Sequence, residues 1–187
     1  MQEYTVKVYD YGTEWYQNGK RHRIDGPAIE FNNGEKFWYQ NGKLHRIDGP
    51  AAERKNGIKS WYQNGKLHRI DGPAIESADG GKSWYQNGER HRTDGPAVEW
   101  DGGGTKHWCQ NGEYHRTDGP AIIWSDGTKF WYQNNRYHRT DGPAIERANG
   151  EVEYWENGKE IQNPNKAKEM TVKEISEQLG YNVKVVK

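Results

Sequence analysis

The sequence is poor in the residues that usually form a protein interior. Leu, Ile, Val and Phe together make up only 25 of the 187 residues, a content low enough to raise the question of disorder. Disordered chains also combine a high net charge with few aromatic residues. This chain instead has 9 Trp and 12 Tyr. We therefore expect an ordered protein in which aromatic rings replace leucine as the main source of buried apolar surface.

Net charge and long apolar runs are also absent. The 27 Lys and Arg residues balance the 27 Asp and Glu residues, which argues against a dedicated binder of nucleic acid or anionic membranes, because such proteins carry a basic excess. The same balance argues against an acidic mimic of DNA. No segment reaches the roughly 18 apolar residues of a membrane span, and the N-terminus lacks a secretory signal pattern. We expect a cytoplasmic protein without a membrane partner.

The chain has one cysteine, Cys109, which excludes an internal disulfide and is consistent with a reducing compartment. The equivalent position of other repeat units, described next, is occupied by tyrosine: Tyr16, Tyr39, Tyr62, Tyr85 and Tyr132. We interpret Cys109 as a packing position and not as a nucleophile.

The chain consists of six near-identical units of about 23 residues, each reading Trp-(Tyr/Cys)-Gln-Asn-(Gly/Asn)-x-x-His-Arg-(Ile/Thr)-Asp-Gly-Pro-Ala. The units begin at Trp15, Trp38, Trp61, Trp84, Trp108 and Trp131, and a partial seventh begins at Trp155. A fixed period in this range is typical of a repeat protein whose units pack mainly on their neighbours. The spacing grows from 23 to 24 residues twice, first where the glycine run Gly102–Gly104 can absorb an insertion.

Turn signals divide each unit into short strands. Asn-Gly after Trp-Tyr-Gln, as at Asn41-Gly42, is typical of a type I′ hairpin turn, and a second turn precedes each Trp, as at Asn32–Gly34. We expect two main strands and a shorter third per unit, in a mostly β, elongated, solenoid-like antiparallel meander of six β-hairpin repeats with a C-terminal helix–strand cap. Neighbouring strands lie about 4.8 Å apart, so two strands per unit predict an array of roughly 60 Å. We expect Trp and Ile of adjacent units to form a continuous core.

The two ends depart from the repeat, and three segments follow: a capping strand at 1–14, the repeats at 15–164, and a helix–strand tail at 165–187. Thr171 and Glu174 form a capping-box signature, and Val172, Ile175 and Leu179 share one helical face. Gly180 is expected to end the helix, and Tyr181–Val186 alternates as a final strand. The tail is either a cap or a docking element, and it offers a route to a homo-oligomer.

The His-Arg-x-Asp motif invites a chemical interpretation, but its geometry favours a structural ladder. Equivalent histidines would lie about 10 Å apart, too far to share one metal ion, so we expect neither a metal nor a cofactor. Six identical sites without a neighbouring nucleophile do not suggest catalysis, and we expect no enzymatic activity. Arg and Asp can pair, Asp can cap its own turn, and His can pack on Trp and bond a carbonyl. This predicted ladder includes Trp38, Trp61, Trp84, Trp131, His45, His68, His91, His115, Asp48, Asp71, Asp94 and Asp118.

The repeat resembles the MORN repeat, a 23-residue single-hairpin unit, and most closely the MORN-like repeats of tailed phages and giant viruses, with a looser similarity to YwqK-type antitoxins. The resemblance covers residues 9 to about 162. It implies a binding or scaffolding role and no particular reaction. The His-Arg-x-Asp-Gly-Pro insert departs from ordinary MORN units, so the lipid binding attributed to some of them transfers poorly.

The function that we expect is that of a non-enzymatic binding protein, a phage accessory protein whose repeat array binds a host protein, including one of host defence, or a viral protein. If such a protein has a specific partner, residues that are not copied between units should carry it: Trp100, Trp124, Tyr114 and Tyr137. The alternative is sequestration of a small nucleotide-type ligand by arginines beside aromatic rings, at Arg69, Arg92, Arg116 and Arg139.

Overall fold

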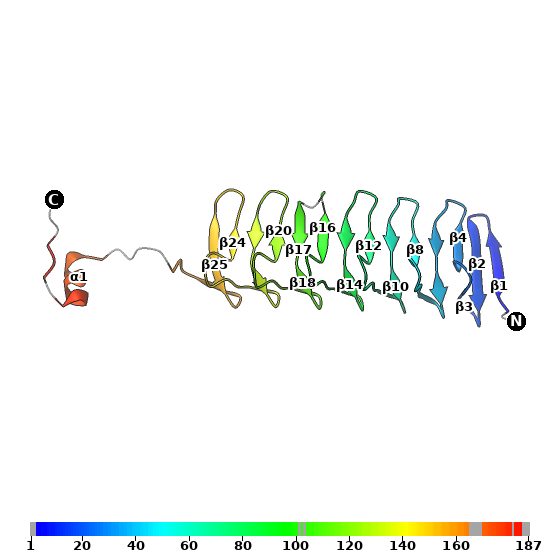
Figure 1. Cartoon of the computed structure of the whole chain (residues 1–187), viewed down its shortest axis with the longest axis horizontal. Coiled ribbons are helices and arrows are strands. Elements are labelled where there is room, and N and C mark those ends of the chain that lie inside the picture. The colour runs from blue at the N-terminus through cyan, green and yellow to red at the C-terminus, as the bar shows by residue number, and fades with distance from the viewer. Residues whose placement is uncertain (1–2, 101, 103, 165–169, 181, 185–187) are drawn as a thin grey trace.

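The computed structural model describes residues 3–100, 102, 104–164, 170–180 and 182–184. Its main feature is an antiparallel sheet of 16 strands whose units follow one another along the chain (Figure 1). The predicted mostly-β repeat meander is therefore confirmed. The strands of this sheet are β1 Thr5–Tyr9, β2 Gly12–Gln17, β3 Lys20–Arg21, β4 Ile29–Phe31, β5 Lys36–Phe37, β8 Ala52–Glu53, β9 Lys59–Ser60, β12 Ile75–Glu76, β13 Lys82–Ser83, β16 Val98–Trp100, β17 Thr105–His107, β20 Ile122–Ile123, β21 Lys129–Phe130, β24 Ile145–Glu146, β25 Val152–Glu156 and β26 Lys159–Ile161.

Two-stranded hairpins form a second row beside the main sheet (Figure 1). They are β6 Tyr39–Gln40 with β7 Lys43–Leu44, β10 Tyr62–Gln63 with β11 Lys66–Leu67, β14 Tyr85–Gln86 with β15 Glu89–Arg90, β18 Cys109–Gln110 with β19 Glu113–Tyr114, and β22 Tyr132–Gln133 with β23 Arg136–Tyr137. An inner unit thus has four short strands and not the predicted three, because tryptophan interrupts the long one. The backbone N–H of Trp38 donates to the carbonyl of Ala51 at 2.8 Å, and the backbone carbonyl of Trp38 accepts from the amide of His45 at 3.0 Å.

The hairpin turns have the predicted type I′ conformation. At Asn41-Gly42 the φ angles are 52° and 79°, and at Asn64-Gly65 they are 51° and 82°, as this turn requires at both central residues. Asn134 and Asn135 adopt the same conformation with φ of 50° and 61°. From the second unit onward, the turn also bonds to the preceding unit, as where the amide of Gly65 donates to the carbonyl of Leu44 at 2.8 Å. Neighbouring hairpins are therefore fixed to one another as well as to the sheet.

The core is a row of small and β-branched side chains, and the tryptophans lie at its margin. The alanine of the Gly-Pro-Ala motif is fully buried in every unit, at Ala28, Ala51, Ala74, Ala97, Ala121 and Ala144. Ile29, Val98, Ile122 and Ile145 continue this row. The repeat tryptophans are only partly buried, so the prediction of a continuous Trp and Ile core is wrong for Trp. Each indole is instead covered by an arginine, as described below.

At the N-terminal end, within the segment predicted as a capping strand, β1 pairs with β2, and Tyr9 lies opposite Gly12 across the turn. At the C-terminal end, helix α1 comprises Val172–Leu179. Thr171 and Glu174 form the predicted capping box, and Gly180 ends the helix with φ of 73°. No helix of the described residues is long and apolar enough to span a membrane.

The predicted strand at Tyr181–Val186 is not formed by residues 182–184, while Tyr181, Val185 and Val186 lie outside the described residues. The amide of Val183 bonds to Ser176 Oγ of α1 at 2.9 Å, so this segment folds back on the helix and not onto a sheet. The helix buries none of its residues. Its role as a cap or a docking element stays a prediction.

Candidate functional site

The copied arginines form the centre of each corner. The guanidinium carbon lies 3.9–4.2 Å from the ring centre of the tryptophan that opens the same unit, for Arg23, Arg46, Arg69, Arg92, Arg116 and Arg139. In the same units Nε bonds to the aspartate two residues later at 2.8–3.1 Å. The Arg Nη1 donates to the proline carbonyl of the corner at 3.1–3.3 Å. The pairing of arginine with aspartate is the one predicted from the sequence.

The glycine of each Asp-Gly-Pro corner makes room for this guanidinium. A Cβ on Gly95 would lie 3.0 Å from Arg92 Cζ, and one on Gly72 would lie 2.9 Å from Arg69 Cζ. Neither glycine has a positive φ, so the backbone conformation does not demand glycine here. Glycine is required because the arginine packs closely against it.

A second carboxylate approaches most of these arginines from the sheet. Nη1 of Arg69 lies 2.8 Å from Glu76, and Nη1 of Arg92 lies 3.3 Å from Glu99. Arg116 departs from this pattern, because Ile123 occupies the equivalent sheet position. Hydrogen bonds from the arginines hold the pKa values of Asp48, Asp71, Asp94, Asp118 and Asp141 below their usual value. The arginine of each corner is therefore ion-paired, while the aspartate remains largely exposed.

The copied histidines connect consecutive units. Nδ1 accepts a hydrogen bond from the backbone amide of the turn asparagine of the next unit, for example Asn64 to His45 and Asn87 to His68, both at 3.1 Å. The predicted carbonyl partner of the histidine is wrong: the partner is a backbone N–H, exposed by the tight type I′ turn. No group of three or more metal-ligating side chains occurs among the described residues.

The residues that are not copied converge on one place. Trp100 of β16, His107 of β17, Tyr114 of β19 and Trp124, which follows β20, form what we call the aromatic patch. The His107 ring centre lies 5.9 Å from that of Trp100, 5.6 Å from that of Tyr114 and 6.4 Å from that of Trp124. Of the four predicted partner-binding residues, the structure thus brings three around His107.

Tyr137 lies further along the array. It stacks on Tyr132 with ring centres 4.3 Å apart and contacts Trp155 at 5.4 Å. Tyr132 also contacts Tyr114 at 5.4 Å, so a continuous series of aromatic rings connects the aromatic patch to the seventh unit. Burial and a hydrogen bond with Tyr137 raise the pKa of Tyr132.

The two sides of the aromatic patch differ in exposure. Trp100 is 41% exposed and Trp124 is 50% exposed, whereas His107 beneath them is 7% exposed. Neither ring nitrogen of His107 has a hydrogen-bond partner among the described residues. Burial, with a contribution from the positive charge of Arg90, lowers the pKa of His107. A neutral imidazole therefore serves as an apolar support for two exposed indoles.

Cys109 is fully buried beside this cluster and faces Tyr114 across the β18–β19 hairpin. Burial raises the pKa of its thiol to about 11, so the thiol stays protonated at neutral pH and is a poor nucleophile. Its burial agrees with the interpretation of Cys109 as a packing position.

His107 is the residue of this patch that was not among the predicted binding residues. It occupies the position just before the repeat tryptophan, where other units have Phe37, Ser60, Ser83 and Phe130. Its departure from those neighbours was the available signal. Comparison of the chain with protein families and with curated proteins finds no match.

Proposed function

We propose that this chain is a non-enzymatic binding protein that docks a protein partner on the aromatic patch. The observation that carries the proposal is the pair of half-exposed indoles of Trp100 and Trp124, both held against the buried ring of His107. Tryptophan is enriched among residues that dominate protein–protein binding energy. Rings fixed from behind also lose little conformational freedom on binding.

The rest of the array supports a binding role of this kind. Trp100 packs on Gly81 of the preceding unit, where a Cβ would lie 3.1 Å from its Cδ1. The equivalent sheet positions of other units carry Phe31, Arg54, Ser77 and Arg147, so two consecutive tryptophans are not required by the fold. The guanidinium groups that a nucleotide would need are engaged with carboxylates and indoles, which favours a protein partner over the nucleotide alternative. A phage origin and a host or viral partner rest on the resemblance of the repeat motif.

The test is affinity capture from a bacterial lysate with the wild-type chain and with a Trp100→Ser, Trp124→Ser variant. Serine is the residue of the third unit at this position, Ser77, so the variant should keep its fold, which circular dichroism and thermal melting would verify. We expect at least one protein to be enriched by the wild type and lost with the variant. The control variant Ile47→Thr, Ile70→Thr changes exposed residues outside the aromatic patch and should retain it. Equal capture by wild type and tryptophan variant, or no specific capture, would refute the proposal.

A further inference from the structure

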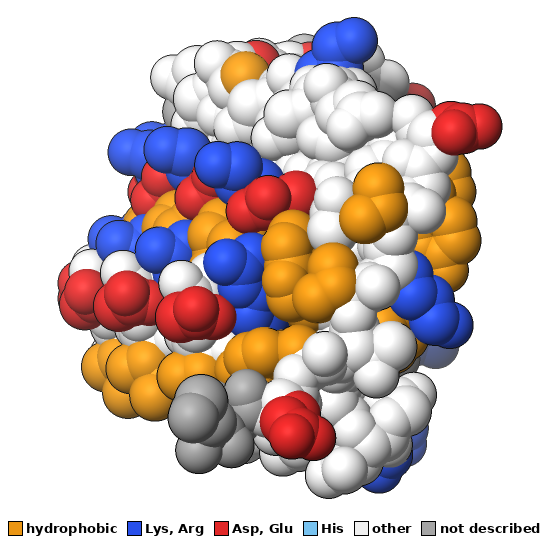
Figure 2. All heavy atoms as spheres, turned by 90° about the vertical axis from the view of Figure 1, so that its right-hand side faces the viewer, with side chains coloured by type: hydrophobic (Ala, Val, Ile, Leu, Met, Phe, Trp, Pro, Cys, Tyr) orange, Lys and Arg blue, Asp and Glu red, His pale blue; other side chains and the backbone are white. Residues whose placement is uncertain are grey.

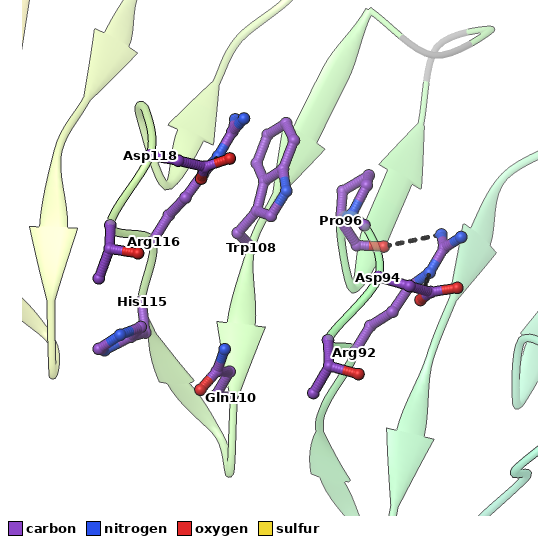
Figure 3. A pocket seen from close by; sticks show the side chains of 11 residues that line it. Arg92, Asp94, Pro96, Trp108, Gln110, His115, Arg116 and Asp118 are labelled. Carbon is purple, nitrogen blue, oxygen red and sulfur yellow. Dashed lines mark hydrogen bonds and ion pairs between the residues drawn. The ribbon is translucent and has the colours of Figure 1, made fainter.

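A row of recesses lies between consecutive corners, and no residue of the aromatic patch lines them. The recess between the second and third units has a volume of about 560 Å³ and is lined by Ile47, Asp48, Trp61, Gln63 and Ile70, among others. Equivalent recesses of about 430, 540 and 550 Å³ lie between other pairs of units. Figure 3 shows one of them, in which Trp108 and Gln110 lie between the Arg92–Pro96 corner and the Arg116–Asp118 corner.

Each recess contains polar groups that the fold does not use. The glutamine after Trp-Tyr or Trp-Cys is copied in six units, at Gln17, Gln40, Gln63, Gln86, Gln110 and Gln133. Within the described part of the chain, the side chain of Gln63 makes no hydrogen bond, and the indole N–H of Trp61 donates none. A ligand in the recess could therefore bond to a free amide and a free indole N–H.

Three exposed isoleucines make the rims of two recesses apolar without a structural reason. Ile24, Ile47 and Ile70 follow the arginines of the first three units and are 58%, 80% and 80% exposed. The same position is threonine in the last three units, at Thr93, Thr117 and Thr140, although these units form the same corners. The isoleucines thus create an apolar row beside the aspartates. Figure 2, viewed toward the N-terminal end, shows rows of apolar, acidic and basic side chains running along the array.

At the recess rims the aspartates are far more exposed than the arginines, although the lining of the second recess contains two of each, Arg46, Asp48, Arg69 and Asp71. Each arginine there faces two carboxylates, as Arg46 faces Asp48 at 3.0 Å and Glu53 at 3.6 Å. Glu53 does not line the recess and lies opposite Lys59 in the sheet, and the Arg46 side chain is only 24% exposed. The Asp48 and Asp71 side chains are 83% and 84% exposed, so a ligand with basic groups would meet complementary charge.

The spacing of the recesses selects the conformation of a bound chain. Two strands per unit, each about 4.8 Å from the next, give a period of about 9.6 Å. A polyproline II helix has three residues per turn and rises about 3.1 Å per residue, so it presents the same face every 9.3 Å or so. A β-strand presents the same face about every 6.8 Å, which does not match.

From these observations we propose that the recess row of the first three units binds an extended peptide in the polyproline II conformation. The peptide has an apolar side chain at every third residue, which enters a recess between isoleucine rims. A Lys or Arg beside it meets the aspartate row, and its carbonyls accept from the tryptophan indoles and glutamine amides. This site is independent of the aromatic patch and does not rest on the function proposed above.

The test uses a fluorescein-labelled peptide of four copies of Pro-Leu-Lys, titrated with the full chain and followed by fluorescence anisotropy at low ionic strength. A peptide of the same composition, shuffled so that leucines do not recur at every third residue, is the control ligand. We expect saturable binding of the periodic peptide and binding of the shuffled one that is weaker by about tenfold or more, a difference of roughly 1.4 kcal/mol. Binding should weaken with added salt.

Isoleucine and threonine both occur at the residue after the corner arginine, so variants that exchange them should keep the fold. Ile47→Thr with Ile70→Thr should weaken binding about tenfold, and Gln40→Ala with Gln63→Ala should also weaken it. Thr93→Ile should extend the apolar row and strengthen binding. The Trp100→Ser, Trp124→Ser variant should bind the peptide like the wild type. The proposal is overturned by an absence of saturable binding, by equal affinity for the two peptides, or by isoleucine and glutamine variants that bind unchanged.

Discussion

The guanidinium carbon of Arg92 lies 3.9 Å from the centre of the Trp84 ring, and this stacking recurs in every complete unit. The same side chain bonds Asp94 at 2.9 Å and the carbonyl of Pro96 at 3.1 Å. One arginine therefore joins the tryptophan at the start of a unit to the corner at its end. Stacking, a forked donor and a positive charge are combined only in arginine.

Replacing this arginine by lysine tests how much the planar, forked hydrogen-bond donor of the guanidinium contributes to stability. Arg92→Lys keeps the charge but cannot stack flat on Trp84 while donating to both Asp94 and Pro96. We expect the free energy of unfolding to fall by about 1–3 kcal/mol, measured by urea denaturation with Lys82→Arg on the sheet as the control. A loss below about 0.5 kcal/mol, the range of neutral surface substitutions, would show that charge alone suffices.

The corner glycine gives a second prediction, which concerns whether a Gly→Ala substitution raises or lowers the free energy of unfolding. Gly→Ala at a compatible backbone position usually stabilises a protein, because it restricts the unfolded chain. Gly95→Ala should instead destabilise, since its Cβ would meet Arg92 Cζ at 3.0 Å. In an Arg92→Ala background the same substitution should be neutral or stabilising. A double-mutant cycle by urea denaturation measures this coupling, and equal effects in both backgrounds would contradict it.

The hydrogen bond of the copied histidine predicts different stabilities when His45 is replaced by asparagine or by glutamine. Nδ1 of His45 accepts from the amide of Asn64, and the side-chain oxygen of asparagine can take the place of Nδ1, whereas that of glutamine extends toward the place of Nε2. His45→Gln should lower the free energy of unfolding by about 1 kcal/mol, and His45→Asn by less. The two variants are compared by thermal and urea unfolding. If glutamine were tolerated better than asparagine, the hydrogen bond would not explain the copied histidine.

The sequence predicted the fold through its period and its turn residues, because Asn-Gly and Asp-Gly-Pro constrain the backbone locally. It also predicted the Arg–Asp pairing, since residues two apart share one side of an extended segment. It misassigned the tryptophans to the core, because a pattern of apolar residues does not reveal that an arginine covers each indole. It singled out Trp100, Trp124 and Tyr114 as exceptions but not their meeting around His107. Their arrangement around His107 depends on the register of three strands, in which His107 lies opposite Val98 on one side and Ile122 on the other. No local signal in the sequence specifies this register.

The buried imidazole of His107 provides a pH-dependent prediction. Burial lowers its pKa in the folded state, while the unfolded chain has the ordinary value of about 6.5. Between these two values the unfolded state binds more protons, so stability falls as the pH drops below about 6.5 and the loss levels off below the folded pKa. His107→Phe introduces the side chain that Phe37 and Phe130 carry at the equivalent position. It keeps an aromatic support under Trp100 and Trp124 while removing the titratable group.

We expect thermal unfolding to show the wild type losing stability relative to His107→Phe between pH 7 and pH 5, two values that bracket the ordinary pKa. Capture of a partner on the aromatic patch should persist in this variant, because the indoles remain supported. Parallel pH profiles of the two proteins would mean that the imidazole is protonated in the fold without cost, and so would contradict its role as a neutral support.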